Sequence, residues 1–191
     1  MVESEDAVLA LDQTLSTRRV EERLERTAGE RQRILLATVA AHLRAESTAD
    51  VDQLLATLVA QPDYHLWSGG RDVGPKGRVG VLGYYQKLVE DRRQILEFDV
   101  DRIVVDDDVV VTEGWIRAIN RGDIARNRGW EVDDEQASYL VTQRVVIFWP
   151  FDGEGRMLGE DGYATWDPHG ARKLVEDELP DAYRALFVNV A

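Results

Sequence analysis

The chain has 191 residues, a formal net charge of −13 and no cysteine. A negative charge of this size repels nucleic acid and anionic membrane surfaces, so neither is expected as a partner. The lack of cysteine excludes a disulfide framework, a thiolate nucleophile and a cysteine metal site. No apolar run approaches the roughly 18 residues that cross a bilayer, and the acidic N-terminal residues are unlike a secretory signal, so a cytoplasmic location is expected.

The first half of the chain is predicted to be mainly helical. Residues 4–28 carry only a thin apolar stripe on a charged helix, which indicates that this helix packs on a partner subunit or wraps the domain. Wider stripes after Gly29 and from Thr48 to Pro62 predict two helices that face a core. A short strand over residues 64–67, a glycine-rich loop and a helix over residues 79–93 follow.

The second half reads as long antiparallel strands. They are predicted at Glu97 to Val105, Val109 to Ile119, Tyr139 to Phe151 and Arg156 to Trp166. The alternation of apolar and polar residues shifts between Val100 and Ile103, which predicts a β-bulge and a bent sheet. A polar loop is expected over residues 120–136, a helix from residue 167 to about residue 178, and a last short helix from Pro180. Helices followed by strands indicate an α+β domain, in which the bent strands curl around the helices into an open cone.

The last hairpin contains the first candidate for catalysis. With a four-residue turn over residues 152–155, one face of the hairpin holds apolar side chains together with Gln143, Trp149 and Glu160. Burial would raise the pKa of the Glu160 carboxyl and suit it to proton transfer. The alternative is a structural carboxylate whose partner is His42, Gln143 or a backbone donor.

His42 and Glu46 lie one helical turn apart. The pair is either an acid–base dyad at the edge of a pocket or a local contact near the end of a helix. We expect Glu160 to face His42 across the cavity. Tyr85 is in register with core positions of its helix, where a phenol either polarises a substrate carbonyl or simply fills the core.

Metal and cofactor sites are poorly supported by the sequence. The chain has three histidines, His42, His65 and His169, and none belongs to a two-histidine helical motif. Neither a metal nor a cofactor is therefore expected.

Several short motifs resemble the nuclear transport factor 2-like superfamily, and within it the SnoaL-like polyketide cyclases. The matching segments are residues 42–46, 48–58, 64–66, 84–85 and 159–163. The resemblance covers residues 31–168, which leaves a helical N-terminal extension over residues 1–30 and a helical C-terminal extension over residues 169–191. It implies a cone-shaped curved antiparallel sheet around three helices, an apolar pocket inside the cone, and a homodimer formed through the outer face of the sheet.

The sequence departs from the motifs of two activities known in this superfamily. The strand Glu113-Gly114-Trp115-Ile116-Arg117 lacks the Arg-x-Asp pair of the epoxide hydrolases, and Glu160-Asp161-Gly162 stands where the ester cyclases have a motif resembling His-Trp-Asp. Close identity with either activity is not expected.

Together these features predict a cofactor-independent enzyme that performs cyclisation, isomerisation, dehydration or hydrolysis on a small apolar carbonyl compound. Glu160, His42 and Tyr85 are the expected catalytic residues. The expected substrate contacts are Glu46, Tyr64, Trp67, Glu113, Trp115, Gln143 and Trp149. One alternative is a non-catalytic ligand-binding or dimerisation module of the same fold. Another is that the N-terminal helix recruits a partner protein.

Overall fold

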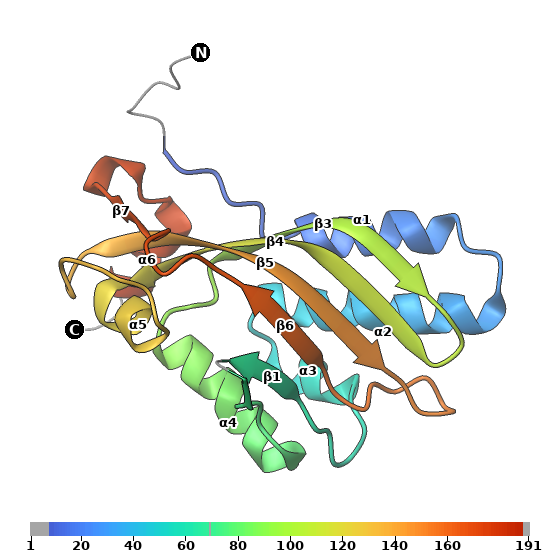
Figure 1. Ribbon diagram of the computed structural model, residues 1–191. Coiled ribbons are helices and arrows are strands. Elements are labelled where there is room, and N and C mark those ends of the chain that lie inside the picture. Colours follow the sequence, from blue (N-terminus) through green and yellow to red (C-terminus); the bar gives the residue numbers. More distant parts are fainter. Residues whose placement is uncertain (1–7, 69, 189–191) are drawn as a thin grey trace.

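A curled, unclosed sheet packs against helices in the computed structural model, which describes residues 8–68 and 70–188 (Figure 1). The helices are α1 (Leu15–Glu25), α2 (Glu30–Ser47), α3 (Val51–Ala56), α4 (Gly77–Glu90), α5 (Gly122–Asn127) and α6 (Asp181–Val188), with a 3-10 turn at Glu176–Glu178. The strands are β1 (His65–Ser68), β2 (Arg71–Asp72), β3 (Leu96–Val105), β4 (Val109–Arg121), β5 (Ser138–Pro150), β6 (Asp161–Thr165) and β7 (Arg172–Leu174). This is the α+β cone that the sequence predicts.

The order of the strands across the sheet is β2-β1-β6-β5-β4-β3, and β7 pairs with the start of β5. Neighbouring strands are antiparallel except for β1 and β6, which run parallel. The register between β3 and β4 shifts between Val100 and Arg102, so the predicted bulge is confirmed. A bulge bends its strand, and this bend curls the long strands over the helices.

The main core lies between α2 and the inner face of the sheet. Leu35, Leu36 and Val39 of α2 have no exposed surface and pack in one cluster with Val110 and Trp149 of the strands. Burying each side chain of this size contributes about 1.5–3 kcal/mol to stability. The wide apolar stripe of α2 therefore holds the helix inside the cone.

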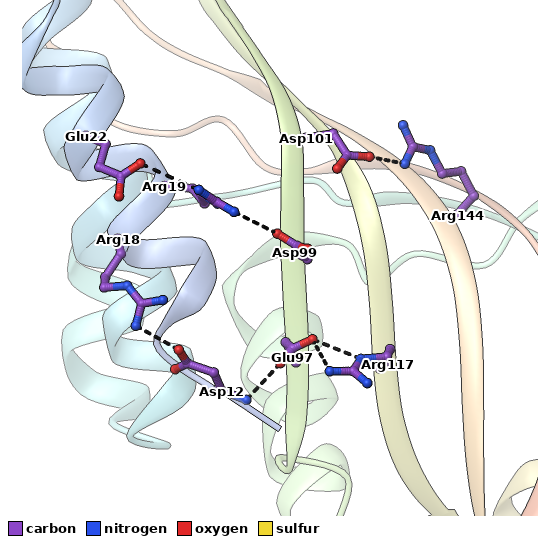
Figure 2. Close-up of polar contacts among 9 residues, drawn as sticks. All are labelled: Asp12, Arg18, Arg19, Glu22, Glu97, Asp99, Asp101, Arg117 and Arg144. Carbon is purple, nitrogen blue, oxygen red and sulfur yellow. Dashed lines mark hydrogen bonds and ion pairs between the residues drawn. The ribbon is translucent and has the colours of Figure 1, made fainter. Parts of the chain in front are cut away.

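Helix α1 lies along the edge strand β3, as Figure 2 shows. Val20 of α1 is fully buried in the main core. Arg19 bridges Glu22 of its own helix and Asp99 of β3, and the backbone N–H of Asp12 donates to Glu97 (Figure 2). The helix thus wraps the domain and covers its exposed edge, which is the second of the two arrangements that the thin stripe indicated. The predicted first turn around residue 4 lies outside the described residues.

Two segments differ from the prediction. The expected loop over residues 120–136 contains α5, whose first turn is held by the ion pair between Arg121 and Asp123 and by an Asp123 side-chain bond to the N–H of Ile124. The expected helix after residue 167 is wrong: Gly170 follows a turn at Asp167, and residues 172–174 pair with β5 as β7. The short helix after Pro180 is confirmed as α6.

The hairpin between β5 and β6 has the predicted faces with a shifted register. Ile147 was expected opposite Glu160, whereas it lies opposite Gly162. The turn holds one residue more than predicted, because Phe151 bridges to Met157, and one further residue is inserted before β6. A shift by two residues keeps each side chain on its side of the sheet, so Glu160 still points inward. No helix within residues 8–68 and 70–188 is long and apolar enough to cross a membrane.

Candidate functional site

A cavity of about 590 Å³ lies inside the cone. Its sheet wall includes residues of β3, β4 and β6 and, at the centre, the alternate β5 residues Gln143, Val145, Ile147 and Trp149. Helices α2 and α4 supply Leu43, Glu46 and Tyr85, and the start of β6 supplies Glu160. Most of the lining is therefore apolar, with carboxylates and a phenol at the end next to Trp149, as expected for a site that binds an apolar molecule and acts on one polar group of it.

Glu160 meets His42 and Tyr85 at this end of the cavity. Its Oε1 lies 3.1 Å from Nε2 of His42 and 3.0 Å from the hydroxyl of Tyr85. The Nε2 atom of His42 is also 3.3 Å from that hydroxyl. The exposed fractions are 0% for His42, 4% for Tyr85 and 8% for Glu160, so this hydrogen-bonded group is shielded from bulk water. The expected meeting of Glu160 with His42 is confirmed.

Thr57 fixes the protonation of the other ring nitrogen of His42. The hydroxyl of Thr57 donates its one hydrogen to the carbonyl oxygen of Leu54, at 2.7 Å. Its oxygen lies 2.7 Å from Nδ1 of His42 and must therefore accept a hydrogen bond from that nitrogen. Nδ1 carries the hydrogen, which leaves Nε2 to exchange protons with Glu160 and Tyr85.

Glu46 joins the group through Tyr85 and not through His42. The hydroxyl of Tyr85 lies 2.9 Å from Oε1 of Glu46. Burial, followed by the charge of Glu160, raises the pKa of Glu46 to about 7. Of the two interpretations of the His42–Glu46 spacing, neither the dyad nor the local contact describes the structure, because Glu46 is hydrogen-bonded to Tyr85 of another helix.

The tyrosines keep their protons near neutral pH. Burial and then the charge of Glu160 hold the pKa of Tyr85 and of Tyr64 well above the ordinary value for a phenol. Their hydroxyls lie 3.3 Å apart. Tyr85 therefore remains a hydrogen-bond donor, but its single hydrogen cannot serve both Glu46 and Glu160 at the same time. A protonated Glu46 resolves this shortage, which fits its raised pKa.

His42 holds its proton more tightly than an ordinary histidine. Burial lowers the pKa of His42, but the hydrogen bond to Glu160 and the charges of Glu46 and Glu160 outweigh burial and raise that pKa overall. The imidazole of His42 and the carboxyl of Glu46 thus influence each other's protonation: the charge of Glu46 raises the pKa of His42, and the charge of His42 lowers the pKa of Glu46.

Gly159 allows Glu160 to approach its position. A Cβ atom at Gly159 would lie 1.8 Å from the carbonyl oxygen of Asp63, which is closer than any real contact. The next residue is tied to β1, because the N–H of His65 donates to the carbonyl oxygen of Glu160 at 2.7 Å. Only glycine permits this close contact between the two chain segments.

Gly159→Ala is expected to lower the free energy of unfolding by about 1–3 kcal/mol, since the backbone of residue 63 or of residue 159 must move. Gly153→Ala is the matched control, because nothing lies within 4 Å of a Cβ placed there. Its expected effect is within about 0.5 kcal/mol. Urea unfolding of both variants beside the wild type measures the difference, and equal stability of the two would contradict the close approach.

The remaining predicted site residues fall into three groups. Gln143, Trp149 and Trp67 line the cavity, and Trp67 is 42% exposed. The indole N–H of Trp149 donates to Thr112 at 2.9 Å. Tyr64 is fully buried behind Tyr85, outside the lining, and so is His42, which was expected at the edge of the pocket.

Glu113 and Trp115 lie on the outer face of the sheet, so their prediction as substrate contacts is wrong. Glu113 forms ion pairs with Arg102 and Arg144, both at 2.7 Å. The Arg144 guanidinium lies over the Trp115 ring, 5.3 Å from its centroid. Trp115 is 47% exposed despite its apolar ring.

His42, Glu46 and Glu160 also offer a set of possible metal ligands, with one atom from each within 4.8 Å of the others. The hydroxyl of Tyr85 lies 2.9–3.3 Å from an atom of each of the three. An ion bound at about 2 Å from all three would have to displace this hydroxyl. The arrangement therefore fits a shared-proton group better than a metal centre.

Sequence reasoning missed Thr57, Arg93 and Arg128. Arg93 and Arg128 line the far part of the cavity. A threonine at a helix end often forms a hydrogen bond to a nearby backbone group, so the sequence gives a weak indication that the Thr57 hydroxyl is bonded. Its contact with His42, however, depends on the packing of α3 against α2. The two arginines stand in polar segments that resemble surface, and no local pattern distinguishes them.

No family model matches the sequence, and no curated protein matches it either. Solved structures match the fold. A candidate SnoaL-like polyketide cyclase from Shewanella denitrificans OS-217 has a TM-score of 0.59 at 13% identity, over 69% of this chain and 90% of its own. One from Shewanella putrefaciens CN-32 has a TM-score of 0.58 at 12% identity, over 86% of this chain and 92% of its own.

A nuclear transport factor 2-like protein of unknown function from Burkholderia pseudomallei K96243 has a TM-score of 0.53 at 16% identity, over 71% of this chain and 92% of its own. These likenesses identify the fold and specify no reaction. The chain thus has the fold of these SnoaL-like and nuclear transport factor 2-like structures.

Proposed function

We propose that the protein is an enzyme that performs acid–base chemistry on an apolar carbonyl compound, without a cofactor. The observation that carries the proposal is the carboxylate of Glu160, which lines an apolar cavity and is hydrogen-bonded to a buried histidine and a buried tyrosine. Buried proton-exchanging groups that converge on a cavity are typical of active sites. Cyclisation, isomerisation, dehydration and hydrolysis all proceed by such proton transfers.

In the proposed first step Glu160 removes a proton from the carbon beside the carbonyl group. The C–H bond breaks, its electron pair moves toward the carbonyl oxygen, and the proton passes to the carboxylate. Tyr85, which stays protonated, turns its single hydrogen from Glu160 to the substrate oxygen that becomes negative. Return of this proton to another carbon of the substrate completes an isomerisation. If a deuteron from the solvent first replaces the proton on Glu160, its delivery to the original carbon completes an exchange.

His42 does not touch the substrate in this scheme, because it lies outside the cavity lining. Its role is to hold Glu160 at 3.1 Å in one orientation and to spread the charge of that carboxylate. Thr57 in turn holds the imidazole.

The exchange of carbon-bound protons for deuterium in a simple apolar ketone tests this proposal. Cyclohexanone and 1-decalone in D₂O are suitable probes, followed by proton NMR. We expect saturable exchange at the carbons beside the carbonyl that exceeds the buffer rate. Saturable binding of both ketones with exchange at the buffer rate would oppose catalysis and favour the binding-module alternative.

We also propose that the protein is a homodimer formed through the outer face of the sheet. Phe148 and Tyr163 are 38% and 47% exposed and pack edge to face, and Tyr163 stacks on Trp67 where this surface meets the cavity lining. Exposed aromatic groups of this kind mark interaction surfaces. Sedimentation velocity is expected to give a dimer for the wild type and a monomer for Phe148→Glu, whereas a monomeric wild type at micromolar concentration would contradict the dimer.

A further inference from the structure

The cavity changes character along its length. Trp149, beside the His42 ring, marks one end of the wall formed by β5. Asn120 of β4 pairs with Tyr139, which is ten residues from Trp149 along the same strand, so Asn120 lies toward the other end of this wall. Beyond Gln143 the lining includes Arg93, Arg128 and several polar groups in place of carboxylates.

Four polar side chains at this far end lack a hydrogen-bond partner among the described residues. They are Gln94, Asn120, Trp130 and Trp166. Asn120 and Trp130 are each 2% exposed, and both amide atoms of Asn120 are unbonded. Gln94 and Asn120 are neighbours, because each lies two residues beyond the paired positions Leu96 and Ala118. Buried polar groups without a hydrogen-bond partner are rare in folded proteins, so these groups are expected to bind a ligand.

Two guanidinium groups accompany these orphaned polar atoms. Arg93 and Arg128 form no ion pair within the part of the chain that the structure describes, and Nε of Arg93 has no partner. Burial and then the charge of Arg93 lower the pKa of Arg128 to about 10, so the two cations are close enough to repel each other. Asp91, the acid whose charge acts on Arg128, is already bound by Lys87.

We propose that Arg93, Arg128 and the indole N–H groups of Trp130 and Trp166 bind the carboxylate of an apolar acid, whose body extends along the cavity toward Glu160. This proposal rests on the proposed function in one respect only, namely that the bound acid is the substrate. Binding of the acid at this site requires no reaction.

The chemistry of the site fits this ligand. Guanidinium groups bind carboxylates through paired hydrogen bonds, and an anion between Arg93 and Arg128 removes their mutual repulsion. The indole nitrogens of Trp130 and Trp166 can only donate, as an oxygen anion requires. The apolar wall between the two ends suits an elongated apolar body.

Calorimetric titration with decanoate and with the uncharged decanamide tests the site. We expect decanoate to bind at least about tenfold more tightly than decanamide, because the contact involves charged hydrogen bonds. Arg93→Gln and Arg128→Gln are each expected to weaken decanoate binding by about tenfold or more and to leave decanamide unchanged. Arg126→Gln is the matched control, since Arg126 lies in the same segment but pairs with Glu135 outside the cavity lining.

Equal affinity of the wild type for decanoate and decanamide would overturn the proposal, as would the absence of saturable decanoate binding. The comparison of the two ligands needs no variant, so a glutamine variant that fails to fold leaves the test intact. Glu160→Gln separates the two proposals: it is expected to retain decanoate binding even where ketone exchange is lost. If exchange is never observed while decanoate still binds through Arg93 and Arg128, the catalytic proposal fails and this one stands.

Discussion

Replacing Glu160 with glutamine is expected to lower the rate of ketone proton exchange by about 10²- to 10⁴-fold, the range that a general base contributes. Glutamine has nearly the same shape, still accepts a hydrogen bond from Tyr85 and still lies beside His42, but it cannot accept the proton of a C–H group. Because the packing is retained, the thermal unfolding of Glu160→Gln is expected to stay close to that of the wild type.

Glu113→Gln is the matched control for this substitution. Glu113 is a carboxylate of the same chain that pairs with Arg102 and Arg144 on the outer face, away from the cavity. Its exchange rate is expected to equal that of the wild type. Undiminished exchange in a folded Glu160→Gln protein would remove Glu160 from the reaction.

Replacing Glu46 with glutamine is expected to stabilise the protein, by about 1 kcal/mol at pH 5.5 and about 3 kcal/mol at pH 8. The pKa of Glu46 rises from 4.5 to about 7 on folding. Above pH 4.5 the unfolded chain loses this proton while the folded chain keeps it, so the free energy of unfolding falls as pH rises and reaches its full loss above pH 7. The glutamine side chain carries no charge at any pH, and its amide offers the Tyr85 hydroxyl both a donor and an acceptor.

His42 acts in the same direction, because its raised pKa makes stability decline as pH rises through its folded-state value. Urea unfolding at pH 5.5 and pH 8 measures both effects. Glu25→Gln is the control, an exposed glutamate whose replacement is expected to change the free energy of unfolding by less than about 0.5 kcal/mol at either pH. A gain from Glu46→Gln that is equal at the two pH values would contradict the raised pKa.

The sequence predicted those features that depend on periodicity. The stripe of α2 identified the core helix, and strict alternation along β5 placed Trp149 and Gln143 on the inner face even though the turn was misjudged. The inward orientation of Glu160 survived because the error in register was two residues, an even number. Periodicity also located the bulge after Val100.

Features that depend on contacts between distant segments could not be predicted from the sequence. On β4 the large apolar ring of Trp115 indicated that its face of the strand was partly buried, whereas Val110, Thr112 and Gly114 of the other face point inward. Trp115 is instead covered in part by Arg144. Likewise, the helical spacing of His42 and Glu46 indicated a contact, whereas Thr57 and Tyr85 come from other helices and occupy those positions.

The state of the His42 imidazole tests the central claim, that Glu160 and His42 share a proton in a buried group at the cavity. Nitrogen-15 NMR distinguishes the two ring nitrogens of His42 and follows their titration. We predict a hydrogen on Nδ1 at every pH, a pKa above that of an ordinary histidine, and a fall of this pKa in Glu160→Gln, where burial acts without the carboxylate. A His42 with its hydrogen on Nε2 and free Nδ1, or with a pKa that Glu160→Gln leaves unchanged, would contradict the account.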